Sequence, residues 1–401
     1  MSQTDVFGHE PTSRSRASGE ADAELLAALL AVIEHGASDL HVSAGTPPLM
    51  RVDGALRPVP DARTWDRERT AQALLGIMRP DQLAEFERSL ELDFSFGLAD
   101  RARFRVNYYQ ERDAIGGAFR LIPTEIRTLE ELGMPEAVAR FARLPRGLVL
   151  VTGPTGSGKS TTLAALIDLV NTTRSDHIVT VEDPIEFLHV HKRSLVNQRE
   201  VGHDTHSFAN ALKHVLRQDP DVILIGELRD LETISIALTA AETGHLVFAT
   251  LHTQDAAQTV DRVIDVFPPH QQNQVRAQLA ATLQGVVCQT LVPKIGGSGR
   301  VVATELMTVT PAIANLIRDG KTYQIGSAMQ AGGEFGMHTL DQNLAQLVNA
   351  GMVDVRAAME RAHDRTGFQQ LVRRSHSPSE AAAQALSGGG IDFGDRFSGG
   401  Y

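Results

Sequence analysis

Short apolar runs alternate with helical patterns from Gly147 onward. The runs are LVLVTG, HIVTVEDP, DVILIGE, HLVFATLH and RVVATELM, and the segments between them repeat their apolar residues every three to four positions. Fully apolar strands that alternate with helices are typical of a parallel sheet covered on both faces. We therefore predict an α/β domain over residues 141–372, in which residues 311–372 are mostly helical.

The chain before Gly147 has a different rhythm. A helical period begins at Asp22 and ends at Gly36, and the runs DLHVSAG, PLMRVDGALRPV, RARFRVNYYQ and AIGGAFRLIP follow between Gly and Pro turns. Alternation over such short runs indicates half-buried strands. The pattern predicts an α+β domain over residues 23–123, followed by a linker and lead-in helix over residues 124–140.

The two ends of the chain carry no packing pattern. Residues 1–22 are rich in Ser, Gly and charge, and residues 373–401 are rich in Gly and Ser. We expect a disordered leader and a flexible tail, with a partner-gripping peptide as the alternative for the tail. The leader lacks the apolar core of a signal peptide, and no run approaches the roughly 18 apolar residues of a membrane helix. The sequence thus predicts a cytoplasmic protein without membrane insertion.

Composition and charge narrow the classes of function. The chain has 38 Lys and Arg against 49 Asp and Glu, a net charge of −11, which disfavours a nucleic-acid binder. Cys288 is the single cysteine, so neither an intrachain disulfide nor a cysteine-based zinc site is possible. We expect Cys288 to be a small buried apolar residue.

The segment GPTGSGKS satisfies the pattern G-x-x-x-x-G-K-[ST] between a predicted strand and a predicted helix. Its glycines let backbone N–H groups surround a phosphate, and the helix N-terminus adds positive potential. Lys159 can reach the β and γ oxygens of ATP, and Ser160 can ligate Mg²⁺. The predicted nucleotide-binding residues are Gly153, Pro154, Thr155, Gly156, Ser157, Gly158, Lys159, Ser160 and Thr161.

Acidic residues end the next apolar run, in IVTVEDPIEF. Glu182, Asp183 and Glu186 would face the ligand crevice if this strand ends at the same sheet edge as the phosphate loop. We expect the strand to be a neighbour of the phosphate-loop strand, because consecutive strands often are. One of the carboxylates could then polarise the attacking water. A solvated turn opened by Asp-Pro is the alternative.

Two further strand ends carry polar side chains. Glu227 ends DVILIGE, where a carboxylate suits a Mg²⁺-bound water or the catalytic water. Arg229 and Asp230 follow it and could form a local ion pair. His252 ends HLVFATLH and could sense the γ-phosphate, whereas His245 lies at the start of that strand.

Hydrolysis of a phosphoanhydride also needs positive charge against the transition state. Arg103, Arg105, Arg112 and Arg120 lie within 18 residues on the two strands that close the first domain. Each of them alone is a solvated surface charge, but together they are candidates for an arginine finger.

The stretch LRQDPDVILIGELRD resembles the signature of the secretion ATPase superfamily, which drives type II secretion and type IV pili. SDLHVSAGTPPLMRVDGALRPV resembles the opening of its N-terminal PAS-like domain, and VNQREVG resembles the loop after its Asp box. The resemblance covers about residues 23–370. The superfamily's Walker A, Asp box, Walker B and His box match Gly153–Thr161, Glu182–Glu186, Ile223–Glu227 and Gly244–His252.

The resemblance implies a PAS-like domain followed by a RecA-like P-loop ATPase domain, assembled as a homohexameric ring. ATP then lies between the C-terminal domain of one subunit and the N-terminal domain of its neighbour or of its own chain. By the same resemblance Arg105 and Arg120, with Arg112 next, face phosphate. Glu182 is implied as the general base, and Glu227 as the partner of a Mg²⁺-bound water.

The retraction branch of the superfamily is favoured. Extension and secretion ATPases usually carry a CxxC…CxxC zinc subdomain and a longer N-terminal region, whereas this chain has one cysteine. TAAETGHLVFATLHT and GMHTLDQNLAQLV indicate the same branch. The retraction motif AIRNL reads AIANL here, at residues 312–316, which leaves an accessory retraction paralogue as an alternative.

The sequence therefore predicts a Mg²⁺-dependent ATPase motor that powers pilus retraction and twitching motility. Its expected partners are an inner-membrane pilus platform protein and a paralogous pilus ATPase, with no nucleic acid. The remaining alternatives are an extension or type II secretion ATPase, a non-hydrolysing nucleotide-dependent regulator and a nucleic-acid translocase.

Overall fold

The computed structural model describes residues 22–52, 54–98, 101–122, 125–296 and 299–375. The chain divides into two compact units. The first ends at Glu125 and also takes in Pro184–Leu188, and the second comprises Ile126–Asp183 and the chain from His189 onward. Nearly all of the predicted leader and tail lies outside the described residues. In the described part of the chain, no helix is long and apolar enough to cross a membrane.

The described strands of the first unit form an antiparallel sheet in the order β3-β2-β1-β6-β5-β4. The predicted alternating runs are present as strands, and β4 is an additional one. The bounds are α1 Ala23–Glu34, β1 Asp39–Val42, β2 Leu49–Val52, β3 Ala55–Pro58, α2 Arg67–Leu75, α3 Pro80–Ser89, β4 Glu91–Leu98, β5 Ala102–Glu111 and β6 Ala114–Ile122.

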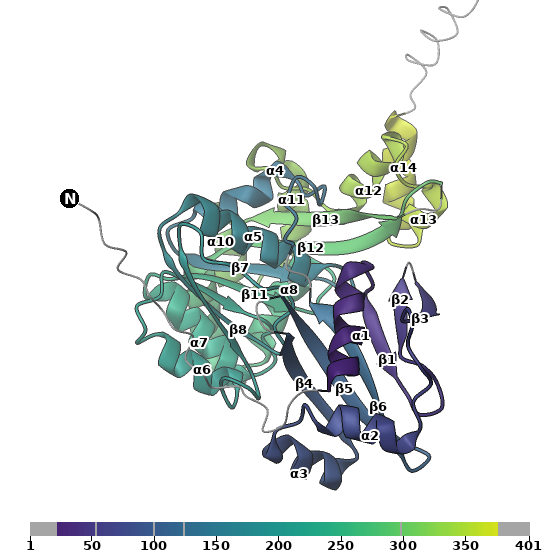
Figure 1. Cartoon of the computed structure of the whole chain (residues 1–401). Helices are drawn as coiled ribbons and strands as arrows, with labels where there is room; N and C mark the ends of the chain where they lie inside the picture. The colour runs from purple at the N-terminus through teal and green to yellow at the C-terminus, as the bar shows by residue number, and fades with distance from the viewer. Residues whose placement is uncertain (1–21, 53, 99–100, 123–124, 297–298, 376–401) are drawn as a thin grey trace, which may run out of the picture. The chain divides into compact units, whose positions relative to one another are not determined.

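One face of this sheet packs on α1 and α2 (Figure 1). Asp22 begins α1 by accepting the N–H groups of Glu24 and Leu25. Tyr108 is fully buried in this core, and its hydroxyl donates to the carbonyl of Leu74 at 3.1 Å. Burial raises the pKa of Tyr108 well above its ordinary value.

In the second unit, the described strands form a sheet in the order β13-β12-β7-β11-β10-β8-β9. Its strands are parallel except β13, which runs antiparallel to β12. The bounds are β7 Gly147–Thr152, β8 His177–Glu182, β9 Leu195–Glu200, β10 Val222–Ile225, β11 Leu246–Leu251, β12 Leu283–Pro293 and β13 Arg300–Thr308.

The predicted parallel strands are present, with three corrections. The run RVVATELM is β13, whose direction is antiparallel. The segment VNQREVG, which the resemblance places in a loop, contains the strand β9. The expectation that β8 neighbours the phosphate-loop strand β7 is wrong, because β11 and β10 lie between them. β12 is a strand that the sequence pattern does not predict.

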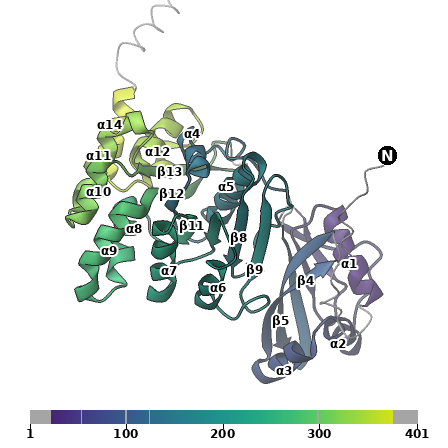
Figure 2. The same ribbon diagram turned by 90° about the vertical axis from the view of Figure 1, so that its left-hand side faces the viewer.

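Helices cover both faces of the second sheet. One cluster packs α4 and α5 on one face, and another packs the helices from α6 to α11 on the other (Figure 2). The bounds are α4 Glu136–Ala139, α5 Lys159–Thr173, α6 Phe208–Val215, α7 Leu231–Glu242, α8 Ala256–Asp265, α9 Pro269–Thr282, α10 Pro311–Arg318 and α11 Ile325–Ala331. Short 3-10 turns are η1 Arg140–Arg143, η2 Thr322–Gln324 and η3 Gly333–Phe335.

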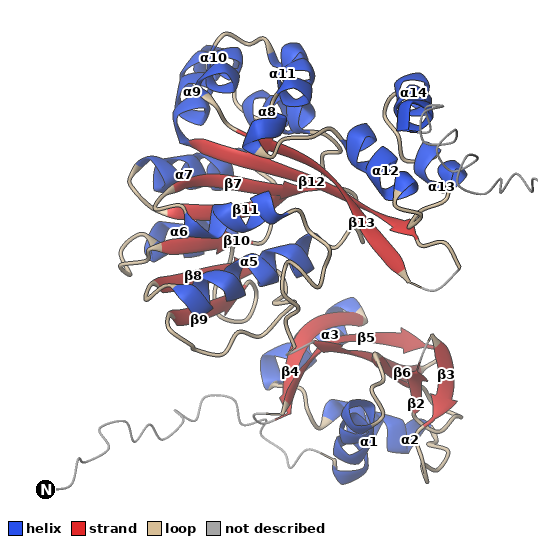
Figure 3. Ribbon diagram, turned by 90° about the horizontal axis from the view of Figure 1, so that it is seen from above, coloured by secondary structure: helices blue, strands red, loops and turns tan. Residues whose placement is uncertain are grey.

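The hairpin of β12 and β13 extends beyond the rest of the sheet and carries the last helices (Figure 3). Val292, Val301 and Ala303 near its tip form a small core with these helices. The helices are α12 Leu340–Asn349, α13 Val355–Met359 and α14 Arg365–Ser375. The helical character predicted for residues 311–372 is confirmed.

Gly285 on β12 lies where the pairing with β7 shifts register. A Cβ at this position would collide with the ring of Phe141 and would lie 2.9 Å from the carbonyl oxygen of Met307. We expect Gly285→Ala to lower the free energy of unfolding by about 1–3 kcal/mol, because a filled core has no room for the methyl group. The measurement is urea unfolding followed by circular dichroism.

The matched control is Gly326→Ala in α11, where a Cβ would meet nothing within 4 Å. That variant should be neutral or stabilised by about 0.5–1 kcal/mol, because Ala favours helix over Gly. Equal effects of the two substitutions would contradict the packing that we describe at Gly285.

Candidate functional site

The C-terminal ends of four parallel strands lie in a row at one edge of the second sheet, in the order β7, β11, β10 and β8. The phosphate loop follows β7, His252 follows β11, Glu227 follows β10, and Glu182 ends β8. Neighbouring strands are about 4.8 Å apart, so Glu182 is roughly 15 Å across the sheet from β7. The strand order thus places the phosphate loop, His252, Glu227 and Glu182 in a row along one edge of the sheet.

The loop between β7 and α5 has the backbone shape of an anion cradle. Gly153, Gly156 and Gly158 have φ of 139°, 77° and 89°, a region that favours glycine. Gly158 is the N-cap residue of α5 and supplies no side-chain cap. The first N–H groups of α5 therefore have no partner within the helix and can bind an anion. These features fit a nucleotide phosphate.

Lys159 lies at the start of α5, and its ammonium donates to carbonyls of the loop itself. Its Nζ is 2.9 Å from the oxygen of Gly153 and 3.2 Å from that of Pro154. Ser160 and Thr161 are half-buried in the first turn of the same helix. Among the described residues, no group of three or more His, Cys, Asp or Glu could hold a metal. A Mg²⁺ bound through one hydroxyl and substrate phosphates needs no such group.

Glu227 is held between two basic side chains. Its Oε2 accepts a hydrogen bond from Nε of Arg229 at 2.8 Å and lies 2.8 Å from Nη2 of the same guanidinium. Its Oε1 lies 3.1 Å from Nε2 of His252. The hydrogen bonds and charge of Glu227 raise the pKa of Arg229. The suggested Arg229–Asp230 ion pair is not present: Asp230 caps α7 by accepting the N–H of Thr233.

Glu182 is almost buried, with 9% of its surface exposed. Its Oε1 accepts hydrogen bonds from the hydroxyl of Thr180 at 2.6 Å and from the amide of Gln198 at 3.2 Å. The other end of the Gln198 amide accepts the N–H of His189 at 2.8 Å. The sequence analysis missed Thr180 and Gln198 as hydrogen-bond partners of Glu182. The amide side chain of Gln198, which lies between Val196 and Val201, was a sign that it could bind a buried polar group.

The candidate arginines belong to the first unit. Arg105 and Arg120 are directly opposite each other on β5 and β6, and Asp39 on β1 is opposite Arg120. Nε of Arg120 lies 2.8 Å from Oδ1 of Asp39, although 72% of the Arg120 side chain is exposed. Arg112 lies in the turn between the two strands, with 88% of its side chain exposed.

The pKa of Asp39 reflects this arrangement. Burial alone would raise it, but hydrogen bonds from Ser38 and Arg120 outweigh burial and lower it. Asp39 is therefore held as a carboxylate beside Arg120.

Comparison with known proteins decides the family. A family model described as "Type II/IV secretion system protein" matches residues 23–360. The chain belongs to this family. It is 55% identical over 329 residues to the "Type IV pilus retractation ATPase PilT" of Pseudomonas aeruginosa, covering 82% of this chain and 95% of the relative.

Two further similarities bear on the branch of the secretion system family. The chain is 41% identical to the "Type IV pilus ATPase PilU" of Pseudomonas aeruginosa, over 89% of this chain and 92% of that one. The structure described as "Pilus Retraction Motor PilT and Bound ADP" superposes with a TM-score of 0.81 at 47% identity, covering 86% of this chain and 99% of that chain. The resemblance to the retraction branch is confirmed.

The departure from the branch motif lies in α10. Ala314, where the motif AIRNL has arginine, packs against the core cluster that includes the helices from α6 to α11, as does Leu316. The carboxamide oxygen of Asn315 accepts a hydrogen bond from Arg318 at 2.6 Å. This family member therefore has an apolar contact at the position of the motif's arginine.

Cys288 is buried on β12 and accepts a hydrogen bond from the hydroxyl of Thr152 at 3.0 Å. Burial raises the pKa of its thiol well above the ordinary value. The expected role as a buried apolar residue is confirmed.

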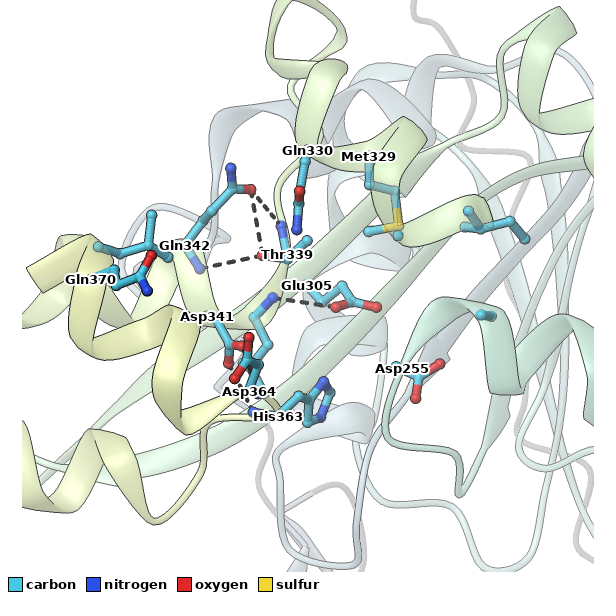
Figure 4. Close-up of a pocket in the computed structure, with 16 residues that line it drawn as sticks. Asp255, Glu305, Met329, Gln330, Thr339, Asp341, Gln342, His363, Asp364 and Gln370 are labelled. Carbon is cyan, nitrogen blue, oxygen red and sulfur yellow. Dashed lines mark hydrogen bonds between the residues drawn. The ribbon is translucent and has the colours of Figure 1, made fainter. Parts of the chain in front are cut away.

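A cavity of about 610 Å³ lies among α8, β13, α11, α12 and α14, apart from the phosphate loop. Figure 4 shows Asp255, Asp341, Asp364 and Glu305 around it. Glu305 is buried, and it accepts the N–H groups of Ala256 at 2.8 Å and Leu340 at 3.2 Å. It thereby ties the first turns of α8 and α12 together.

Burial raises the pKa of Glu305 above 4.5, its ordinary value, although the two backbone hydrogen bonds act in the opposite direction. The folded chain therefore keeps this proton to higher pH than the unfolded chain. As pH rises from about 4.5 through the raised pKa, this group contributes progressively less to the free energy of unfolding. Glu305→Gln removes the titration, so the variant should gain stability relative to the wild type as pH rises.

The measurement is urea unfolding of the wild type and of Glu305→Gln at pH about 4.5 and about 7.5. Glu334→Gln, at an exposed site on the same unit, is the control and should show no such change. A stability difference between wild type and Glu305→Gln that stays constant with pH would contradict the assignment.

Proposed function

We propose that this chain is a Mg²⁺-dependent ATPase that powers retraction of type IV pili, and with it twitching motility. The observation that carries the proposal is the row of phosphate loop, His252, Glu227 and Glu182 at one sheet edge. Support also comes from the 55% identity to a protein named as a pilus retraction ATPase. Such a row can bind a nucleoside triphosphate and activate water beside it.

The phosphate loop is proposed to hold the β and γ phosphates of ATP. Backbone N–H groups at the start of α5 and the ammonium of Lys159 would donate to phosphate oxygens. The hydroxyl of Ser160 would ligate Mg²⁺, and Glu227 would accept from a water bound to it. When bound, Mg²⁺ would neutralise charge on the phosphates.

Glu182 is proposed as the general base. The hydrogen bonds from Thr180 and Gln198 would fix its carboxylate, so that one oxygen can take a proton from the attacking water. His252 would sense the γ-phosphate, and its contact with Oε1 of Glu227 would couple the phosphate to that carboxylate. Arg105 and Arg120, and then Arg112, are proposed to stabilise the transition-state charge from the first unit of a neighbour or of the same chain.

The mechanical output is proposed to arise from two units that share one nucleotide. The first unit is proposed to be PAS-like and the second RecA-like, assembled as a homohexameric ring on the cytoplasmic side of the inner membrane. ATP binding would close the units on each other, and hydrolysis would release them. The motion would pass to an inner-membrane pilus platform protein, with a paralogous pilus ATPase as a further partner.

The nearest alternative is an accessory retraction ATPase. It is less favoured because the chain is 41% identical to PilU but 55% identical to PilT. A non-hydrolysing regulator is disfavoured because Lys159, Glu182 and Glu227 are all present. A nucleic-acid translocase is disfavoured by the acidic net charge.

Substitution of Glu182 and of Glu227 should change different kinetic parameters. Glu182→Gln should lower kcat by about 10²–10⁴-fold with ATP affinity retained, because only proton transfer is lost. Glu227→Gln should instead raise the Mg²⁺ concentration for half-maximal activity by roughly 10-fold. Steady-state ATPase assays over a Mg²⁺ series measure both, and the reverse pattern would exchange the two roles.

The retraction role is tested in cells. A deletion strain imaged with labelled pili should show abundant pili that do not retract, because assembly continues without its opposing motor. Complementation with the wild type should restore retraction, and complementation with Glu182→Gln should not. Cells without pili would overturn the proposal in favour of an extension or secretion ATPase.

A further inference from the structure

Gln289 is a polar side chain in the otherwise apolar interior of β12. It is 3% exposed, and the preceding residues Val286, Val287 and Cys288 are also buried. Burying an amide costs free energy unless it is hydrogen-bonded. Its Nε2 donates to the carbonyl oxygen of Ser157 at 2.8 Å, in the middle of the phosphate loop.

The loop is packed directly against this residue at two glycines. A Cβ on Gly153 would collide with the carbonyl of Gln289, and a Cβ on Gly158 would lie 3.3 Å from its Nε2. Side chains at these two positions would therefore push the loop off β12. The contact with Gln289 thus spans the loop from its first glycine to the N-cap of α5.

Two buried polar atoms at this contact have no hydrogen-bond partner. They are Oε1 of Gln289 and the hydroxyl oxygen of Ser157, which is 2% exposed. Buried polar atoms are nearly always paired in folded proteins. One of these atoms belongs to the loop and the other to β12, so the contact between Ser157 and Gln289 can form further hydrogen bonds.

The contact between Gln289 and the carbonyl of Ser157 also sets the direction of the next N–H group, that of Gly158. In a planar trans peptide the C=O and the N–H point in opposite directions. Because the carbonyl of Ser157 points to Gln289 on β12, the N–H of Gly158 points away from β12. An anion bound by the loop on the side away from β12 could accept a hydrogen bond from this N–H.

We infer that Gln289 is a positioning residue of the phosphate loop, which sets the direction of the Gly158 N–H group by holding the Ser157 carbonyl. This inference rests on the proposed nucleotide-binding function. Gln289 acts from beneath the loop, through the peptide, and needs no contact with the nucleotide. Its loss should therefore weaken phosphate binding more than it slows the chemical step.

The test is Gln289→Met in the full-length chain, which keeps the size of the side chain and removes its N–H donor. We expect the dissociation constant of a fluorescent ADP, measured with Mg²⁺, to rise about 10-fold, because a buried carbonyl loses its donor. The kcat at saturating ATP should change less than about 3-fold, since the groups proposed for proton transfer are untouched.

The matched control is Gln284→Met, the same substitution on the same strand. Gln284 is next to Leu283, which pairs with Leu148 at the end of β7 away from the phosphate loop. Its variant should bind ADP as the wild type does. Should Gln289→Met fail to fold, Gln289→Asn, whose shorter amide cannot span the 2.8 Å contact, should give the same rise.

The outcomes are distinct. A wild type that binds no nucleotide would remove the proposed function itself. A wild type that binds ADP, together with a Gln289 variant of equal affinity, would overturn this inference alone. A Gln289 variant with a lower melting temperature, unchanged ADP affinity and reduced kcat would also overturn it, because that pattern indicates only a packing role.

Discussion

The parallel pairing of β7, β11, β10 and β8 is the constraint on which the rest of the site depends. Parallel strands end at the same sheet edge, so residues separated by about a hundred positions in sequence become neighbours there. Glu182 is the last residue of its strand, and His252 and Glu227 follow theirs by one and two residues. These side chains therefore need no long loop to reach the site, and the backbone hydrogen bonds of the sheet fix their positions relative to one another.

Charge within this row is compensated locally. Glu227 is shared by Arg229 and His252, so a carboxylate that is only partly exposed does not stand unpaired. Glu182 is fixed through hydrogen bonds that include Thr180 and Gln198. Glu182 and Glu227 thus have different surroundings. Two carboxylates of one site can take different chemical roles when their surroundings differ in this way.

The sequence could predict what is local. Periodicity identified most strands and helices, and glycine spacing located the candidate phosphate loop between a strand and a helix, because both depend on short-range backbone geometry. Strand order could not be read in this way, because pairing joins distant segments, and β8 was placed wrongly beside β7. β9 was missed since Asn197 and Gln198 interrupt its apolar pattern. The partner of Arg229 depended on Asp230 being used as a helix cap, which only the fold reveals.

Lys159 gives the loop a property that concerns rates. Its ammonium donates hydrogen bonds to the carbonyls of Gly153 and Pro154, so oxygen atoms of the loop itself compensate part of that charge. In the proposed nucleotide site, a phosphate would exchange these oxygen ligands for its own when it binds, and its departure would reverse the exchange. Product release from such a site would leave the ammonium hydrogen-bonded rather than bare, because the carbonyls of Gly153 and Pro154 would take the place of the departing phosphate.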